Sequence, residues 1–402
     1  MAEGVRVRQV GRTKRIVAQI GLGLAAMALG ACSTVVPRAP IERVAEAPRI
    51  ERPRDIEPQV EAGIPRDTER NRVALLVPLS GGNAGIGTSI ANATQLALLD
   101  TNTTRVRITT YDTAKGAATA ARQAIDEGAQ LILGPLLAED ARAVGPIARA
   151  AGVPVLSFSN DTGVAGQGTY VMGYAPAQSI TRVVEFARSR GVTSFAGLVP
   201  NGLYGERAST AFLRAVESGG GQVVSLQTFA RAPGAISAAA TRIAAKAPYD
   251  AVMIADGGAT AAAAAPLAKR GSPGARLLGT ELWNAEAGIA ARPQLAGAWF
   301  ASVSDGLYRQ FATKYRARFG TGPYRLASLG YDAVLLTVRI ARDWPVGTRF
   351  PEARLRDPGG FAGLDGALRF GRDGVADRAL EVQEIRGGTA VTVSPAPTGF
   401  GR

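Results

Sequence analysis

Short apolar runs alternate with alanine-rich amphipathic segments along most of the chain after residue 72. Four residues or more without a polar interruption, as at 73–79, are typical of parallel strands that are covered on both faces. Further strands are expected at 106–111, 131–133 and 153–156, with helices at 86–99, 117–127 and 139–150. Strands and helices in this order predict right-handed βαβ units and an α/β fold with a doubly wound parallel sheet.

A second series of the same kind begins after residue 175. It predicts strands at 195–199, 223–226, 251–255 and 277–279, helices at 179–188, 206–217, 235–245, 307–319 and 327–342, and a β-rich tail at 366–370, 380–385 and 389–393. We therefore expect two Rossmann-like lobes, residues 72–175 plus about 300–345 and residues 176–299 plus about 346–393. Ligands of open α/β sheets bind at the carboxyl ends of the strands, so a central cleft is the expected site.

The N-terminus has the pattern of an export signal. Five basic residues precede residue 16, and residues 16–29 carry no charge. This stretch is too short to span a bilayer but suits the apolar region of a signal peptide. It ends in Leu-Gly-Ala-Cys at Cys32, which resembles the lipobox of bacterial lipoproteins. The resemblance implies cleavage after residue 31 and acylation of Cys32. The alternative is a chance cysteine after an ordinary signal.

Residues 32–71 are expected to form a disordered tether. Prolines recur there among Arg, Glu and Ala without apolar periodicity, and such sequences stay extended. The tether either carries the folded part toward peptidoglycan or is a generic linker.

Removing the first 31 residues, with a net charge of +4, lowers the charge of the chain from +13 to about +9. A basic surface favours anionic partners, but an exported protein meets no nucleic acid to regulate.

The composition excludes several kinds of chemistry. The chain has no histidine and one cysteine, so it cannot form a Ser-His-Asp triad, a Cys-His pair, a histidine zinc site or an internal disulfide. No cluster of carboxylates has metal-ligand spacing, and no Walker A sequence is present. Gly85 and Gly87 begin a dinucleotide fingerprint, but Ile90 occupies its third glycine position. We therefore expect no catalytic residues, no metal and no cofactor.

Several short motifs, in their order along residues 72–393, resemble the type I periplasmic-binding-protein superfamily, in its branched-chain amino-acid receptor branch. They are Val-Pro-Leu-Ser-Gly at 77–81, Tyr-Asp-Thr at 111–113, Leu-Gly-Pro-Leu at 133–136, Pro-Val-Leu-Ser-Phe-Ser-Asn at 154–160, Tyr-Gly at 204–205, Asp-Ala-Val at 250–252, Tyr-Asp-Ala at 331–333 and Gly-Leu-Asp-Gly-Ala-Leu-Arg-Phe at 363–370. The resemblance implies two lobes around a ligand cleft.

Within that superfamily, residues 134–137 followed by 156–160 look most like the penicillin-binding protein activators. The resemblance implies an outer-membrane lipoprotein of the periplasm, which Ser33 after the lipidated cysteine also suggests. It implies binding to a class A penicillin-binding protein, contact with peptidoglycan and regulation of peptidoglycan synthesis without catalysis. One departure is that a helical-repeat domain precedes the binding-protein-like domain in the best-known activators, whereas a tether occupies that place here.

The first lobe supplies four candidate ligand contacts. Ser80 and Gly81 precede a predicted helix, whose first backbone N–H groups can hold a carboxylate. Ser157 and Ser159 follow the fourth predicted strand. The amino-acid receptors use the matching turns in this way. The alternative at both places is helix capping and turn formation without a ligand.

The second lobe supplies Tyr204, Asp256 and Glu281. The resemblance implies an aromatic wall at Tyr204 and an acid for a ligand ammonium at Asp256, and Glu281 is expected to flank the same cleft. An acid after a strand is otherwise a loop cap.

Three functions remain: a tethered regulator, a solute-binding protein that delivers a branched-chain or other amino acid to an ABC importer, and an enzyme, for which the sequence shows no nucleophile and base.

Overall fold

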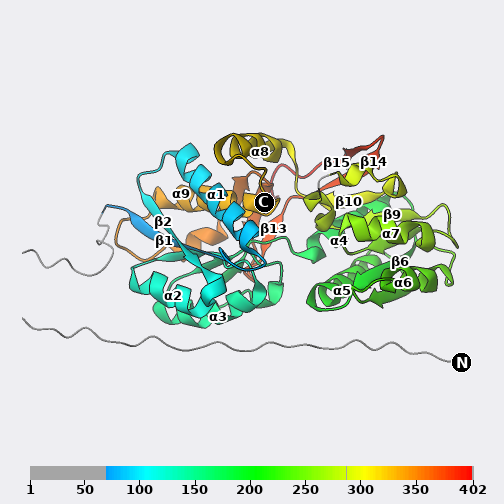
Figure 1. Ribbon diagram of the computed structural model, residues 1–402, viewed down its shortest axis with the longest axis horizontal. Coiled ribbons are helices and arrows are strands. Elements are labelled where there is room, and N and C mark those ends of the chain that lie inside the picture. The colour runs from blue at the N-terminus through cyan, green and yellow to red at the C-terminus, as the bar shows by residue number, and fades with distance from the viewer. Residues whose placement is uncertain (1–68, 287, 401–402) are drawn as a thin grey trace, which may run out of the picture. The chain divides into compact units, whose positions relative to one another are not determined.

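The computed structural model describes residues 69–286 and 288–400 (Figure 1). These residues form two mostly parallel sheets, both covered by helices, and a small antiparallel sheet. The predicted α/β fold with two doubly wound lobes is therefore confirmed. The predicted signal peptide, Cys32 and nearly all of the tether lie outside the described residues. Within the described part, no helix is long and apolar enough to cross a membrane.

The sheet of the first lobe is parallel throughout. Its order is β2-β1-β3-β4-β5, with bounds Val106–Asp112, Asn71–Val77, Leu131–Leu133, Val155–Ser157 and Thr169–Val171. Successive side chains of β1 point to opposite faces: Leu75 packs in one core and Leu76 in the other. Both are fully buried. An unbroken apolar strand is therefore what a sheet with two covered faces requires.

Helices cover both faces of this sheet (Figure 1). One core includes side chains from α1 (Ala84–Thr101), α8 (Gly306–Phe319) and α9 (Ala327–Ala341). The opposite core includes side chains from α2 (Ala117–Asp126) and α3 (Ala138–Ala151). The first lobe is thus closed by two helices, α8 and α9, that come from late in the chain.

The second lobe repeats this topology and adds a hairpin. Its sheet has the order β15-β14-β10-β9-β8-β6-β7, with bounds Thr389–Ser394, Glu381–Arg386, Trp299–Ser302, Arg276–Gly279, Ala251–Ile254, Ser194–Pro200 and Gln222–Phe229. Strands β6 to β10 pair in parallel, and β14 pairs antiparallel to β10. The order 7-6-8-9-10 matches 2-1-3-4-5 of the first lobe.

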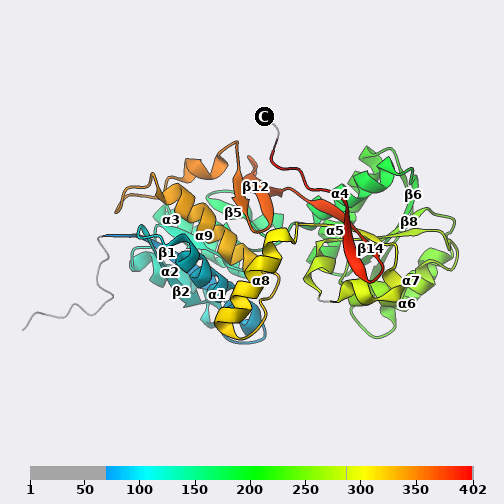
Figure 2. The same ribbon diagram turned by 90° about the horizontal axis from the view of Figure 1, so that it is seen from above.

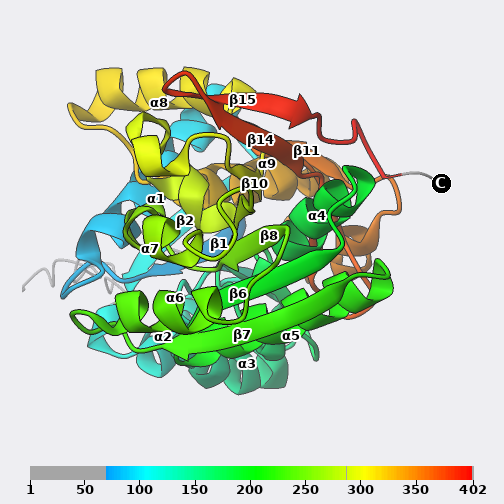
Figure 3. The same cartoon turned by 90° about the vertical axis from the view of Figure 1, so that its right-hand side faces the viewer.

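Two pairs of helices cover the second sheet (Figure 3). Helices α4 (Pro176–Ser189) and α5 (Leu203–Ser218) pack in one core, and α6 (Ala235–Ala244) and α7 (Gly258–Ala268) pack in the other. The connections of the whole described region also contain short 3₁₀ helices at Thr113–Lys115, Thr162–Val164, Glu281–Ala285, Ile289–Ala291, Pro293–Leu295 and Glu352–Arg356.

A glycine allows the helix that follows the first strand of each lobe to approach that strand closely. A Cβ on Gly87 of α1 would lie 1.8 Å from the carbonyl oxygen of Pro78, and one on Gly205 of α5 would lie 1.6 Å from that of Pro200. No side chain larger than hydrogen fits at such distances from a backbone atom. Gly87 therefore has a packing role that needs no dinucleotide.

The late strands correct the expected lobe boundaries. Strands β11 (Phe361–Gly363), β12 (Gly366–Phe370) and β13 (Ala376–Arg378) form the antiparallel sheet, and Phe361, Leu368 and Phe370 pack in the core of the first lobe (Figure 2). The sequence places residues from about 346 onward in the second lobe, but only β14 and β15 join it. Apolar side chains at alternate positions of β12 reach the first core because β11 packs on α9.

The chain therefore passes between the lobes three times. The first connection, residues 172–175, leads from β5 to α4. The second, residues 303–305, leads from β10 to α8, and the third, residues 379–380, leads from β13 to β14. These three short connections are the backbone links between the two lobes.

Candidate functional site

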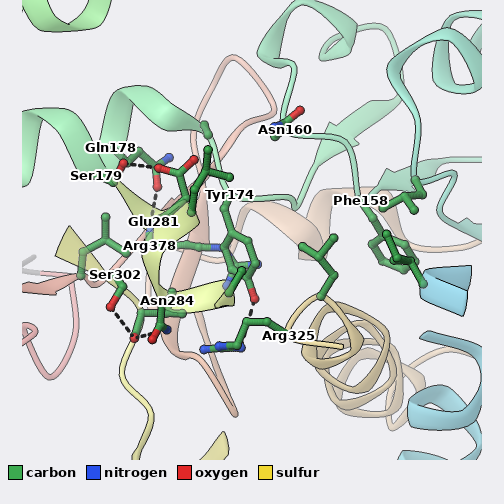
Figure 4. A pocket seen from close by; sticks show the side chains of 18 of the residues that line it. Phe158, Asn160, Tyr174, Gln178, Ser179, Glu281, Asn284, Ser302, Arg325 and Arg378 are labelled. Carbon is green, nitrogen blue, oxygen red and sulfur yellow. Dashed lines mark hydrogen bonds between the residues drawn. The ribbon is translucent and has the colours of Figure 1, made fainter. Parts of the chain in front are cut away.

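A cavity of about 280 Å³ lies between the lobes, and both lobes and their connections line it (Figure 4). Its lining comes from the start of α1, the turns after β3 and β4, the start of α4, the segments after β9 and β10, and the start of α9. The lining residues are Asn83, Ile86, Leu136, Leu137, Phe158, Asn160, Tyr174, Ala175, Gln178, Ser179, Glu281, Leu282, Asn284, Ala285, Ser302, Val303, Arg325, Leu326, Arg378 and Leu380. The cavity thus lies at the carboxyl ends of strands, as expected.

Apolar side chains make up most of the walls. The first lobe contributes Leu136, Leu137 and Phe158, and the second contributes Leu282 and Val303. Phe158 is buried against the core of the first lobe, so its position is fixed by packing. A space of this size, with mostly apolar wall surface and polar side chains at its edges, has the properties of a small-molecule site.

Two buried arginines interrupt the apolar lining and belong to a cluster with Asp365 and Tyr174, here called the arginine cluster. Arg325 Nη1 lies 2.8 Å from Asp365 Oδ1, and Arg378 Nη1 lies 4.0 Å from Asp365 Oδ2. The Tyr174 hydroxyl donates a hydrogen bond to Asp365, and its ring faces the Arg378 guanidinium at 4.9 Å. The side chains of Arg325, Arg378 and Asp365 are 6%, 1% and 0% exposed.

Burial and charge set the protonation of the acids in this cluster. Burial alone would raise the pKa of Asp365, but the guanidiniums of Arg325 and Arg378 outweigh it and hold that pKa below its usual range. Asp332 lies behind, where it accepts hydrogen bonds from the backbone N–H groups of Leu364 and Asp365. Burial, together with the charge of Asp365, raises the pKa of Asp332. Asp365 is therefore the ionised partner of both arginines.

Glu281 is the one acid among the residues that line this cavity, and it lies beside Ser179 (Figure 4). Its Oε1 accepts a hydrogen bond from the Tyr204 hydroxyl at 3.0 Å, and its Oε2 accepts one from the Ser179 hydroxyl. Burial raises the pKa of Glu281, whereas these two hydrogen bonds lower it. Both carboxyl oxygens of Glu281 are thus already engaged by the protein.

Among the seven candidate contacts from the sequence, Glu281 alone lines this cavity. The Ser80 hydroxyl donates to Asp112 Oδ2 at 2.8 Å, in an exposed turn where Gly81 has a φ of 72°. The backbone N–H of Leu79 also donates to Asp112 and holds its pKa below the usual range. The turn before α1 is therefore engaged by Asp112.

The serines at and just after the end of β4, Ser157 and Ser159, do not line the cavity. Ser157 Oγ donates to the carbonyl oxygen of Pro135 at 3.1 Å, and Ser159 Oγ accepts from the backbone N–H of Asp161 at 3.1 Å. Their neighbours Phe158 and Asn160 line the cavity instead (Figure 4). The expected loop therefore does line the cavity, but through Phe158 and Asn160 and not through the serines. The serines form internal hydrogen bonds, which is the alternative given for them above.

Two candidates of the second lobe lie behind the cavity wall. Tyr204 contacts the ligand site only through Glu281, because its hydroxyl bonds with Glu281 and Thr280. Asp256 pairs with Arg231 at 3.2 Å and accepts from the backbone N–H of Gly257 at 2.7 Å, which is the loop-capping role. Neither residue lines the cavity.

Arg325, Arg378 and Tyr174 are among the polar lining residues that were not candidates from the sequence; the others are Asn83, Asn160, Gln178, Ser179, Asn284 and Ser302. Tyr174 lies in the first connection, Arg378 directly precedes the third, and Arg325 lies 3.6 Å from Asp305 in the second. Their common partner Asp365 is in the turn between β11 and β12. Only the Tyr-Asp-Ala and Gly-Leu-Asp-Gly motifs at 331–333 and 363–366 gave a signal nearby. Over residues 69–286 and 288–400, no group of three or more potential metal ligands occurs.

The described residues form a bilobed protein: two lobes with matching strand orders, three connections between them and a cavity lined by both. A family model for periplasmic binding proteins matches residues 71–389, and the chain belongs to that family. The resemblance to the type I periplasmic-binding-protein superfamily is thereby confirmed at the level of family and fold.

Individual proteins share this fold at low sequence identity. A putative branched-chain amino acid ABC transporter protein from Rhodospirillum rubrum has a TM-score of 0.71 and 24% identity, over 81% of this chain and all of the other. Full-length LpoA from Haemophilus influenzae has a TM-score of 0.61 and 20% identity, over 81% of this chain and 59% of the other. An uncharacterized protein of Rickettsia prowazekii, RP748, is 23% identical over 146 residues, 36% of this chain and 39% of its own length.

Proposed function

We propose that this protein is a non-catalytic binding protein of the periplasm whose ligand occupies the cavity between the lobes. The observation that supports the proposal is the cavity itself, because both lobes and the three connections contribute to it. Contacts from both lobes couple ligand binding to the relative position of the lobes. The sequence adds the lipid on Cys32 as the anchor to the outer membrane.

Ligand binding is expected to raise the melting temperature of the full-length protein in detergent. A ligand at 100 times its dissociation constant adds about 2.7 kcal/mol to the free energy of unfolding. We would compare amino acids, short peptides and peptidoglycan fragments in a thermal-shift assay. Ala285→Trp should abolish the shift, because Ala285 lines the cavity and a tryptophan there fills it.

The matched control is Ala150→Trp, because Ala150 is an exposed residue of α3 that does not line the cavity. This variant should keep the full shift. A ligand that stabilises the wild type and the Ala285→Trp variant equally would bind elsewhere and would contradict the proposal.

A second function is favoured by the sequence: the lipoprotein regulates peptidoglycan synthesis by binding a class A penicillin-binding protein. The lipobox at Cys32, the predicted tether and the resemblance to penicillin-binding protein activators support it, and so does the fold shared with LpoA. Delivery of an amino acid to an ABC importer is the alternative. The internal hydrogen bonds of Ser80, Ser157 and Ser159 argue against the amino-acid contacts that this alternative requires.

If the protein is such a regulator, we expect it to form a complex with a class A penicillin-binding protein, which chemical cross-linking should capture at the membrane.

Cys32→Ser is expected to release the protein from the membrane fraction, since acylation of the Cys32 thiol is the anchor. The released variant should still bind the purified synthase, because the folded part is unchanged. If the wild-type protein forms no cross-link with any class A penicillin-binding protein of its host, the second function is wrong.

A further inference from the structure

Asp161 is a buried acid that joins the two lobes beside the cavity. It lies in the loop after β4 of the first lobe, next to the cavity residue Asn160. Arg207 of α5, in the second lobe, places its Nη2 and Nε atoms 3.2 Å and 3.3 Å from Asp161 Oδ1. Arg142 of α3, in the first lobe, contacts the other carboxylate oxygen through its Nη2 atom. An arginine from each lobe therefore shares this carboxylate.

The burial of Asp161 strengthens its pair with Arg207. The side chain of Asp161 is 3% exposed, whereas those of Arg142 and Arg207 are 51% and 46% exposed. A buried ionised carboxylate needs compensating charges and hydrogen bonds, because it has lost contact with water. Salt also screens a partly buried pair less than a pair between two exposed side chains. If the lobes separated here, Asp161 would lose one of its two charged partners.

Hydrogen bonds within the first lobe fix the position of Asp161. The backbone N–H of Ser159 donates to the Ser157 hydroxyl at 3.2 Å, and that of Asp161 donates to the Ser159 hydroxyl at 3.1 Å. The backbone N–H of Gly163 donates in turn to Asp161 Oδ1 at 3.0 Å. A Cβ on Gly163 would lie 2.6 Å from Arg207 Nη2, so the glycine also leaves room for the guanidinium. The loop thus holds the acid where the second lobe can reach it.

The same loop contributes to the cavity. Phe158 and Asn160 line it (Figure 4). Because Asn160 and Asp161 are consecutive residues, the cavity wall and the contact between the lobes move together. Ser157 and Ser159 therefore have a positioning role that needs no contact with a ligand.

The Asp161–Arg207 pair lies away from two of the three connections. Helices α3 and α5 lie at the lower edge of the molecule in Figure 1 and Figure 3, whereas α8 and the β14–β15 hairpin lie at the upper edge. The second connection leads into α8, and the third leads into β14. The pair thus joins the lobes on the side where these two connections do not.

We propose that the Asp161–Arg207 pair is a latch that holds the two lobes together on this side of the cavity. Arg207 is the part of the latch in the second lobe, and Arg142 and the serine hydroxyls position the acid in the first. Opening the cavity on this side requires Arg207 to leave Asp161. The latch acts without a ligand, so this inference goes beyond the proposed function and does not depend on it.

The distance between the lobes tests the latch. Spin labels would be attached at Ala150→Cys in α3 and Ser218→Cys in α5, which are exposed positions near the ends of the two helices. The full-length Cys32→Ser chain is the background, because Cys32 is the only cysteine of the sequence. Pulsed electron–electron double resonance without ligand is expected to give mainly one short distance. Melting of every variant checks that it is folded.

Replacing Arg207 with an acid should open the lobes. Arg207→Glu places two like charges together, which should raise the ratio of open to closed molecules about 100-fold. Arg207→Gln removes the attraction without adding repulsion and should give an intermediate ratio. Asp161→Asn in the Arg207→Glu background should restore most of the short distance, because the repulsion needs the charge of Asp161.

Arg214→Glu is the matched control. Arg214 is an exposed residue of α5, seven positions beyond Arg207 on the same face of the helix, and the substitution changes the charge equally. This variant should keep the wild-type distance.

Two results would overturn the inference. If Arg207→Glu keeps the wild-type distance, or if the wild type is already as open as this variant, the pair does not hold the lobes. Equal opening by Arg214→Glu would assign the effect to the charge of the helix and not to the latch. No ligand is present in these measurements, so neither result bears on the proposed function.

Discussion

Replacing Asp365 with alanine is expected to lower the free energy of unfolding by about 3–5 kcal/mol, the usual effect of removing one partner from a buried ion pair. Asp365 is fully buried and contacts Arg325 at 2.8 Å. It also accepts hydrogen bonds from the hydroxyl groups of Tyr174 and Ser328. Without its carboxylate, two guanidiniums stay buried with no nearby ionised partner except Asp305.

The measurement is urea denaturation of the wild type and the variant, with the slope checked for two-state behaviour. Asp343→Ala is the matched control, because Asp343 pairs with Arg354 and both side chains are more than half exposed. Removing an exposed pair should change stability by about 0–1 kcal/mol. An Asp365→Ala variant as stable as the control would show that the arginine cluster contributes little to the fold.

Replacing Gly205 with alanine is expected to cost about 3 kcal/mol, near the upper end for overpacking a core. The new Cβ would lie 1.6 Å from the carbonyl oxygen of Pro200, a backbone atom that cannot turn aside. Helix α5 would have to move away from β6, and both pack in the same core of the second lobe. Thermal melting and urea denaturation would report the loss.

Gly274→Ala is the control for this substitution. A Cβ at Gly274 meets no atom within 4 Å, and its φ is outside the positive range. Alanine is compatible with such a position and stabilises slightly through the unfolded state, by about 0.4–1 kcal/mol. If both substitutions lowered the free energy of unfolding equally, Gly205 would not be required for the close approach of α5 to β6, and this prediction would be wrong.

The sequence predicted those elements whose periodicity is strong and missed those that lack it. Helix α9 was expected at 327–342 and spans Ala327–Ala341, and β3 has the expected bounds. Helix α7 was missed because Gly258–Ala268 is mostly alanine and has no apolar face to recognise. Strand β3 is equally short but purely apolar, whereas β5 and β10, with three and four residues, each include a hydroxyl residue and so do not form the uninterrupted apolar run that marks a buried strand.

The cavity was harder to predict than the fold, because its polar residues come together only through tertiary structure. Arg325 and Arg378 are separated by 52 positions in the chain, and no local pattern relates them to Tyr174. The expected serines lie at the end of β4 and just after it, but Phe158 and Asn160 line the cavity instead. Side-chain direction in an irregular loop has no period from which it can be read.

The arginine cluster has a mechanical consequence, because each connection between the lobes ends at it. Tyr174 lies in the first connection, Asp305 in the second approaches Arg325, and Arg378 adjoins the third. In a rigid-body rotation about these connections, a point moves in proportion to its distance from the axis. The arginine cluster would lie close to that axis, so a contact made there would do little work on the lobes. The leverage would belong to contacts farther from the connections, so the length and shape of a ligand in the cavity would set how far the lobes turn.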